Sequence, residues 1–385
     1  MSHRCGGDSK RRLLIATDFW ADASRPRLAA RDRTFRGIER HFDVSWTFIA
    51  TNGNPGEHAI PDQVRLVFVP SIRSKWHFFA LLPRYMKILA DAIGRTDVVL
   101  APTPMLTTLP ALLAARLRRR PSFLLVLAPM SGMDFFRRPA IRWAASPFFN
   151  LEVLLSTQTL LLNSHLAEEI LPPLRGRLAV ITFSPIGEED FLPIVEPSVN
   201  APVELLFVGR LKSFKRVDVA IETVRCLRRD GVNATLTVVG DGPDRPRLER
   251  LSEELDLSDV VSFVGWTDDP NQLREYYRRA FALLLPSEIE AFGMVVLEAM
   301  AAGTPVVRTA PTGGLDVLEP EVDVLIASAS SADIFASAVK RLHADRDFYL
   351  RIARAAQTKV RSLTRDAWQR SFCERADRLI RARRR

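Results

Sequence analysis

The second half of the chain alternates between short apolar runs and longer amphipathic stretches, and this alternation constrains the fold more than any other feature. The apolar runs are at 205–208, 234–239, 260–264, 281–285 and 304–307, and the helical stretches are at 218–229, 246–255, 270–280 and 293–302. Nearly continuous hydrophobicity indicates strands buried on both faces, as in a parallel sheet between helices. We therefore predict an α/β, doubly wound domain with ligands beyond the carboxyl ends of its strands.

The first half of the 385-residue chain shows the same alternation less clearly. Its strand-like runs are at 13–16, 64–70, 98–102, 123–128 and 160–163, and its helical stretches are at 78–93, 109–120 and 165–171. Prolines 193, 197 and 202 indicate a linker, because proline cannot donate to a helix or sheet ladder. We predict two Rossmann-like domains facing each other across a cleft, at 1–195 and 196–365, and a helix with a basic tail at 366–385 that packs on the first domain.

Composition excludes several classes of protein. With 47% hydrophobic and 26% charged residues, the chain is neither disordered nor collagen-like. Three cysteines without a Cys-x-x-Cys pair favour a reducing compartment over a disulfide framework. No apolar run reaches the roughly 18 residues needed to span a bilayer, and the run after Arg12 is too short for a signal peptide. We expect a cytoplasmic protein, and attachment to the inner face of a membrane stays open.

The most specific segment runs from Pro286 to Val307. A strand ends at Leu285, a loop carries Glu290, and Gly293 opens a helix that stops at Gly303. The backbone N–H groups at the start of such a helix attract anions. Glu298 lies inside this otherwise apolar helix, where a carboxylate is costly without a partner. The arrangement suits a sugar bound through a diphosphate, and a solvated helix position is the alternative for Glu298.

Two further strand ends carry polar or glycine-rich loops. The strand at 205–208 is followed by Gly209, Arg210 and Lys215, and Asp218 is a predicted N-cap of the next helix. Two cations there fit a diphosphate, since Arg binds oxygens in a fork and Lys acts as a point charge, although a solvated basic loop explains them equally well. Gly240-Asp241-Gly242-Pro243 alone predicts a tight turn, because it lacks the third glycine of the dinucleotide fingerprint.

Taken together, these segments resemble the retaining glycosyltransferases of family 4, which have the GT-B architecture of two Rossmann-like domains. The resemblance covers about 203–326 and rests on motifs in the family's order and spacing. They are Gly209-Arg210-Leu211 with Lys215, Val239-Gly240-Asp241-Gly242-Pro243, Val264-Gly265-Trp266, the Glu-x7-Glu pair Glu290 and Glu298, Ala299 to Val307, and Gly313-Gly314.

The resemblance implies a nucleotide-sugar donor in the second domain and roles for its residues. Arg210 and Lys215 would bind the diphosphate, Glu290 the sugar and Glu298 the ribose. The backbone of Phe292, Gly293, Met294 and Val295 would bind sugar hydroxyls and phosphate. Such enzymes usually work without a metal, and the six histidines here are scattered, so we expect no metal and no cofactor besides the donor.

The first domain departs from the family pattern. The family's Gly-Gly loop after the first strand is replaced by Thr17 to Ser24, and the segment that usually carries a cleft histidine, Ala128 to Asp134, has none. Asp18, Ser131 and Asp134 are candidates for contacts with the acceptor, with a loop or capping role as the alternative for each.

Net charge concentrates in the first half, with +7 of the total +9 in residues 1–200. Basic residues lie among aromatic and aliphatic ones at 71–87, and Arg116 to Arg120 form a second cluster. These stretches fit an anionic membrane surface, or equally a core helix with a basic outer face. We expect no nucleic-acid binding, because no recognised module is present.

We predict a retaining, metal-independent hexosyltransferase that transfers a sugar from a nucleotide diphosphate to a glycan or lipid-linked acceptor in surface-polysaccharide assembly. The alternative is a non-catalytic protein that binds nucleotide sugars with a degenerate fold. A dinucleotide-dependent oxidoreductase is disfavoured by the missing glycine fingerprint.

Overall fold

The computed structural model contains two compact units, which are described separately. The units are residues 1–183 together with 366–385, and residues 184–365. The structure describes residues 10–20, 37–50, 65–70, 75–103, 107–126, 139–196, 198, 201–290, 293–310 and 316–384. The last twenty residues therefore group with the first unit, and the division falls earlier than the proline cluster.

The first unit is built on a parallel sheet of seven described strands in the order β3-β2-β1-β4-β5-β6-β7. These strands are β1 (Arg11–Trp20), β2 (Phe42–Ala50), β3 (Arg65–Pro70), β4 (Val98–Thr103), β5 (Ser122–Val126), β6 (Gln158–Leu161) and β7 (Leu178–Val180). The strand order reverses between β1 and β4, which places the ligand crevice of a doubly wound sheet there.

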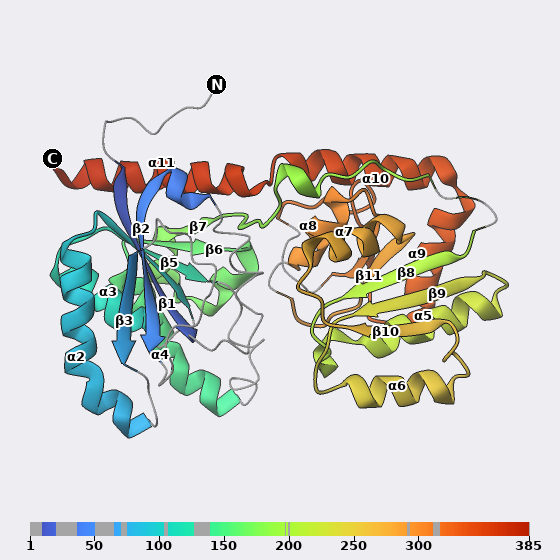
Figure 1. Ribbon diagram of the computed structural model, residues 1–385, viewed down its shortest axis with the longest axis horizontal. Helices are drawn as coiled ribbons and strands as arrows, with labels where there is room; N and C mark the ends of the chain where they lie inside the picture. Colours follow the sequence, from blue (N-terminus) through green and yellow to red (C-terminus); the bar gives the residue numbers. More distant parts are fainter. Residues whose placement is uncertain are drawn as a thin grey trace. The chain divides into compact units, whose positions relative to one another are not determined.

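Helices connect the strands of the first unit (Figure 1). They are α2 (Lys75–Gly94), α3 (Thr108–Leu117) and α4 (Pro139–Leu155). The sequence patterns predicted neither α4 nor β2, and the predicted helix at 165–171 is instead a 3-10 turn at Ser164–Glu169. Pro147 inside α4, and polar residues among the apolar ones in β2, obscured the periodicity.

The helix α11 (Arg365–Arg384) packs on the first unit through aromatic side chains. The ring of Phe372 lies 5.7 Å from that of Phe42 and 5.0 Å from that of Phe123. Arg11 and Asp377 form an ion pair at 3.1 Å. The end of the chain thus completes the core of a sheet whose first strand begins near residue 11.

The second unit is built on a parallel sheet in the order β10-β9-β8-β11-β12-β13. The strands are β8 (Val203–Val208), β9 (Ala234–Val239), β10 (Val261–Gly265), β11 (Ala282–Leu285), β12 (Val306–Thr309) and β13 (Leu325–Ala327). All four residues of β11 and of β12 are buried. Burial on both faces explains why these strands read as continuous apolar runs.

Helices cover both faces of this second sheet (Figure 1). They are α5 (Val217–Arg229), α6 (Arg245–Glu254), α7 (Pro270–Arg279), α8 (Met294–Ala301), α9 (Ala332–Ala344) and α10 (Arg346–Arg361). Because parallel crossovers are right-handed, the connections on either side of β8 place their helices on opposite faces. The strand order reverses between β8 and β11, so a ligand is expected beyond the carboxyl ends of these two strands.

Candidate active site in the second unit

The loops that follow β8 and β11 meet at the point where the strand order reverses. The two strands are neighbours, with Ala282 opposite Leu205 and Leu283 opposite Leu206. The backbone N–H of Glu288 donates to the carbonyl of Phe214 at 2.9 Å. Arg216 reaches from the first loop to the carboxylate of Glu288 in the second, also at 2.9 Å. The two loops are therefore joined by backbone and side-chain contacts.

Two of the predicted site residues form an ion pair between these loops. The ammonium group of Lys215 donates to the carboxylate of Glu290, 75 positions later in the chain. Each side chain is only 16% exposed, so the pair is screened from most of the solvent. A cation and a carboxylate that the resemblance assigns to different parts of one donor thus lie in contact.

Arg210 is exposed in the first loop. Within the described part of the chain, its guanidinium forms neither a hydrogen bond nor an ion pair. It can therefore bind an anion without first releasing another partner.

Gly293 sets the start of α8 beside Glu290. It is the N-cap of the helix, with a φ of 79° in the left-handed region that favours glycine. A Cβ atom there would lie 3.3 Å from Cγ of Glu290 and 3.1 Å from the side chain of Leu285. Met294 and Val295 begin the helix, where backbone N–H groups have no partner inside it. Phe292 lies outside the described residues.

Glu298 has a polar partner that the sequence did not reveal. The hydroxyl of the buried Tyr277, on α7, donates to the Glu298 carboxylate at 2.8 Å. The polar partner that a carboxylate in this apolar helix requires thus comes from a different helix. The bond fixes one oxygen of a half-buried carboxylate on α8.

Gly240 allows the loop after β9 to pack directly on the loop after β8. A Cβ atom at this position would lie 1.9 Å from the backbone oxygen of Gly209. The turn at 240–243 therefore also packs against a neighbouring loop, because the absence of a side chain at Gly240 lets the two backbones come into contact. Asp218 is also not the N-cap that was predicted: the N-cap of α5 is Arg216, and Asp218 accepts a hydrogen bond from the Arg216 side chain.

Arg308 is a charged residue beside the site that the sequence patterns did not single out. It lies on β12 opposite Leu285 and is completely buried. Burial lowers the pKa of its guanidinium to about 10, and the negative charge of Glu290 acts in the opposite direction. The only sequence signal was an arginine within an otherwise apolar strand after Gly303-Thr304-Pro305.

The acceptor-side candidates belong to the first unit. Asp18 lies on β1, but its side chain, like Ser131 and Asp134, falls outside the described residues. A different pair lies on the first unit: Thr103, at the carboxyl end of β4, donates to the carboxylate of Glu152 on α4 at 2.9 Å. Burial outweighs this bond and raises the pKa of Glu152 to about 7.

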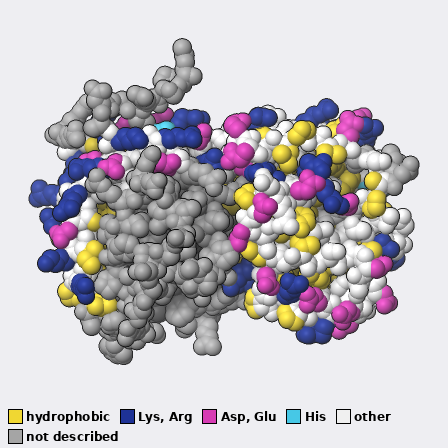
Figure 2. All heavy atoms as spheres, in the orientation of Figure 1, with side chains coloured by type: hydrophobic (Ala, Val, Ile, Leu, Met, Phe, Trp, Pro, Cys, Tyr) yellow, Lys and Arg dark blue, Asp and Glu magenta, His cyan; other side chains and the backbone are white. Residues whose placement is uncertain are grey.

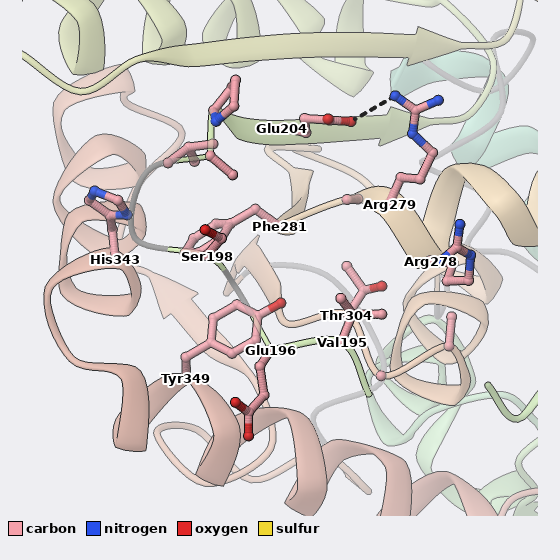
Figure 3. A pocket seen from close by; sticks show the side chains of 16 residues that line it. Val195, Glu196, Ser198, Glu204, Arg278, Arg279, Phe281, Thr304, His343 and Tyr349 are labelled. Carbon is pink, nitrogen blue, oxygen red and sulfur yellow. Dashed lines mark hydrogen bonds and ion pairs between the residues drawn. The ribbon is translucent and has the colours of Figure 1, made fainter. Parts of the chain in front are cut away.

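A cavity of about 230 Å³ lies at the opposite edge of the second sheet, near the amino-terminal ends of β8, β11 and β12 (Figure 3). Its lining includes Tyr349, Arg278 and Arg279. Both arginines are paired, Arg278 with Glu275 and Arg279 with Glu204. The cavity contains none of the predicted site residues.

The described residues contain neither a metal-binding cluster nor a membrane-spanning helix. This part of the chain contains no cluster of three or more His, Cys, Asp or Glu side chains that could bind a metal ion. None of the helices in the described residues has the length and hydrophobicity needed to cross a bilayer.

Two doubly wound parallel sheets, one per unit, define the GT-B class of folds, and solved structures agree. HepE of Anabaena, solved in complex with UDP, superposes with a TM-score of 0.74 over 95% of this chain and 99% of its own, at 17% identity. Residues 190–359 match the family described as Glycosyl transferases group 1. The match lies within the second unit, residues 184–365.

Two curated relatives each match less than half of the chain. Glycogen synthase of Mycobacterium tuberculosis is 38% identical over 165 residues, which are 42% of this chain and 39% of that protein. The lipopolysaccharide core biosynthesis glycosyltransferase LpsE of Rhizobium meliloti is 32% identical over 174 residues, 45% of this chain and 49% of that protein. The matching segments thus span less than half of either relative.

Proposed function

We propose that the protein is a retaining glycosyltransferase that transfers a sugar from a nucleotide diphosphate to a glycan or lipid-linked acceptor. The observation that carries this proposal is the Lys215–Glu290 pair, which joins the two motif loops where the strand order reverses. The family match of the second unit and the UDP bound by HepE support a nucleoside diphosphate as part of the donor.

Binding of the donor would replace contacts that the site residues make with one another. Its diphosphate would bind Arg210 and draw Lys215 away from Glu290, whose carboxylate would then accept hydrogen bonds from the sugar. The N–H groups at the start of α8 would face sugar hydroxyls or phosphate, and Glu298, oriented by Tyr277, would accept from the ribose. Cations on the diphosphate stabilise the charge that develops as it leaves.

The reaction needs no separate base in this proposal. The bond between the anomeric carbon and the diphosphate oxygen breaks, and a bond from the same carbon to the acceptor oxygen forms on the same face. The departing diphosphate takes the proton of the acceptor hydroxyl. The histidine that family members commonly carry in the cleft is therefore dispensable for the reaction class.

A lipid-linked acceptor fits the surface of the first unit better than a soluble one. Figure 2 shows mainly Lys and Arg side chains, among fewer acidic ones, along the edge formed by α2 and α3, whereas the two signs of charge are more evenly interspersed on the visible face of the second unit. Arg116 and Arg119 are exposed near Leu117, which is 70% exposed. On α4, Phe148, Leu151 and Leu154 are exposed at a spacing of three residues, on one side of the helix.

The stretch at 71–87 contributes less to such a surface than its composition suggests. Tyr85 and Leu89 on α2 are completely buried, whereas Arg84 and Lys87 are exposed. This part of α2 is thus a core helix with a basic outer face, the second of the two interpretations of that stretch. The proposed membrane contact therefore rests on α3 and α4.

A thermal-shift screen of the purified protein against UDP-, GDP- and ADP-sugars tests the donor assignment, because a ligand bound only by the folded state raises the apparent melting temperature. The best donor is then incubated with the protein, and release of the nucleoside diphosphate is followed. Binding with turnover supports the transferase. Binding without turnover favours the non-catalytic alternative, and no binding to any of the three contradicts the donor site.

A further inference from the structure

The cavity at the amino-terminal edge of the second sheet is separate from the candidate active site (Figure 3). Its lining comes from the segments that enter β8, β11 and β12, from the end of α9 and from the first turn of α10. All of these segments belong to the second unit. Because β8 is six residues long, about 15–20 Å separates this edge from the loops at its carboxyl end.

Tyr349, in the first turn of α10, is buried at this cavity with no partner for its hydroxyl. The residue is only 3% exposed, and Figure 3 shows its hydroxyl directed toward the other lining residues. Within the described part of the chain, no group forms a hydrogen bond with this hydroxyl. Buried tyrosine hydroxyls usually have a partner, because leaving one without a hydrogen bond costs free energy. The hydroxyl is therefore available to a ligand in the cavity.

The lining combines an aromatic surface with a second hydroxyl. The rings of Phe281 and Tyr349 lie 4.9 Å apart, inclined by 40°. Thr304 is buried, and its hydroxyl donates to the backbone carbonyl of Tyr277 at 2.6 Å. The lone pairs of that hydroxyl can still accept a hydrogen bond. The cavity thus offers apolar contact together with a hydrogen-bond donor and an acceptor.

The carboxylate and guanidinium groups of the lining are paired. Glu204 pairs with Arg279 and Glu196 with Arg346, while Arg278 pairs with an acid on its own helix. A charged ligand would have to compete with one of these ion pairs, whereas a neutral ligand would leave them intact. The lining therefore favours a neutral ligand that has both an apolar face and hydroxyl groups.

We propose that this cavity binds a neutral sugar unit, either a free monosaccharide or the end of a glycan, at a site separate from the donor site. The C–H face of a pyranose ring would pack on Phe281 and Tyr349, and its hydroxyls would bond to those of Tyr349 and Thr304. The volume of about 230 Å³ is below the roughly 300–1,000 Å³ of pockets for drug-sized ligands, and it suits a single sugar ring. Binding here requires neither the donor nor turnover.

Titration of the whole protein with neutral sugars tests this site directly. Methyl glycosides of glucose, galactose, mannose and N-acetylglucosamine are added, and binding is followed by ligand-observed NMR. We expect Tyr349→Phe to weaken the best sugar about fivefold, the effect of losing one hydrogen bond. Ala201→Trp, at an exposed position of the lining, should abolish binding by filling the cavity. Binding of none of the four sugars, or wild-type affinity in both variants, overturns the proposal.

Two further variants show whether the bound sugar lies in this cavity. Tyr276→Phe makes the same change on α7 outside the lining and should keep wild-type affinity. Glu290→Gln changes the candidate active site and should also keep it. An equal loss in Tyr276→Phe contradicts the role of the Tyr349 hydroxyl. A loss in Glu290→Gln assigns the sugar to the donor site and overturns this inference, while the proposed function stands.

Urea unfolding without ligand separates binding from a structural role of the hydroxyl. We expect Tyr349→Phe to keep the wild-type midpoint, because the hydroxyl has no described partner to lose. A lower midpoint would show that the hydroxyl stabilises the fold and would contradict the proposal.

The choice of sugar defines the class of ligand and its source. An oligosaccharide that ends in the best sugar should bind more tightly than its methyl glycoside if the ligand is a glycan end, and equally if it is a free sugar. The 1-phosphate of the same sugar should bind no more tightly than the neutral form. A gain of about tenfold or more from the phosphate would refute a site for neutral sugars.

Discussion

Each unit contains a half-buried carboxyl group, and the two are held in different ways. In the second unit, the carboxylate of Glu290 is in contact with the ammonium group of Lys215. In the first unit, Glu152 is bonded to the hydroxyl of Thr103 and its pKa is raised to about 7 by burial. A carboxylate that is paired with a lysine from another loop is suited to exchange partners with a charged ligand. A carboxyl group held by a hydroxyl instead gains or loses a proton near neutral pH.

The largest effect is expected from removing a charged side chain of the proposed donor site, Glu290 or Arg210. We expect Glu290→Ala, and separately Arg210→Ala, to reduce donor turnover by about 1,000-fold or more while the protein stays folded. The measurement is release of nucleoside diphosphate, with circular dichroism as the check of folding. Arg279→Ala, at the opposite edge of the same sheet, is the control. Wild-type rates in either folded variant contradict the site.

A methyl group added at Gly240 should disrupt the contact between the loops after β8 and β9 and lower the stability of the second unit. We expect Gly240→Ala to lower the free energy of unfolding by about 3 kcal/mol, because its Cβ would overlap the backbone oxygen of Gly209. Gly176→Ala in the first unit is the matched control, since no atom lies within 4 Å of its added Cβ. Similar midpoints in urea for the two variants would show that the loops after β8 and β9 do not touch in this way.

Proton binding by Glu152 should make the first unit less stable as the pH rises. Its pKa rises from 4.5 to about 7 on folding, so the folded state holds the proton more tightly and the free energy of unfolding falls between these pH values. We expect Glu152→Gln to gain about 2 kcal/mol over the wild type at pH 8 and almost nothing at pH 4.5. Unfolding at both pH values, with the exposed Glu168→Gln as control, measures this difference. A constant difference across pH refutes it.

The smallest effect concerns the basic edge of the first unit. We expect Arg116→Glu combined with Arg119→Glu to reduce binding to vesicles with 30% anionic lipid by about 30-fold or more, since each basic residue near such a surface contributes about 1 kcal/mol. Sedimentation with vesicles measures the bound fraction. Arg228→Glu with Arg229→Glu, in the second unit, is the matched control. Equal losses in the two pairs would remove the distinction between the surfaces.

The second unit was predictable as far as β12 because its constraints there act on the backbone, whereas β13, α9 and α10 were not predicted. Gly240 and Gly293 are required by a close approach and by a left-handed conformation, so they stand out as glycines at fixed offsets from the strands. Buried parallel strands likewise appear as apolar runs. By contrast, Arg308 and the Tyr277–Glu298 bond depend on residues brought together by the fold, and no local pattern marks them.

In the first unit, local patterns were less informative for physical reasons. β2 contains Asp43, Ser45 and Thr47 at alternate positions, so it does not read as a run buried on both faces. α4 carries an internal proline and an exposed apolar side, which blur its helical period. The Thr103–Glu152 pair joins a strand and a helix 49 positions apart, a distance that spacing alone cannot connect.

The position of α11 has a consequence for biosynthesis. Phe372 packs on Phe42 and Phe123, yet it is synthesised after every residue of the second unit. During translation, all residues of the second unit are synthesised before the part of α11 that belongs to the first unit, so at that point the first unit still lacks part of its core. The part of the chain made first is therefore the last that can finish folding, and until then its aromatic surface depends on protection from aggregation.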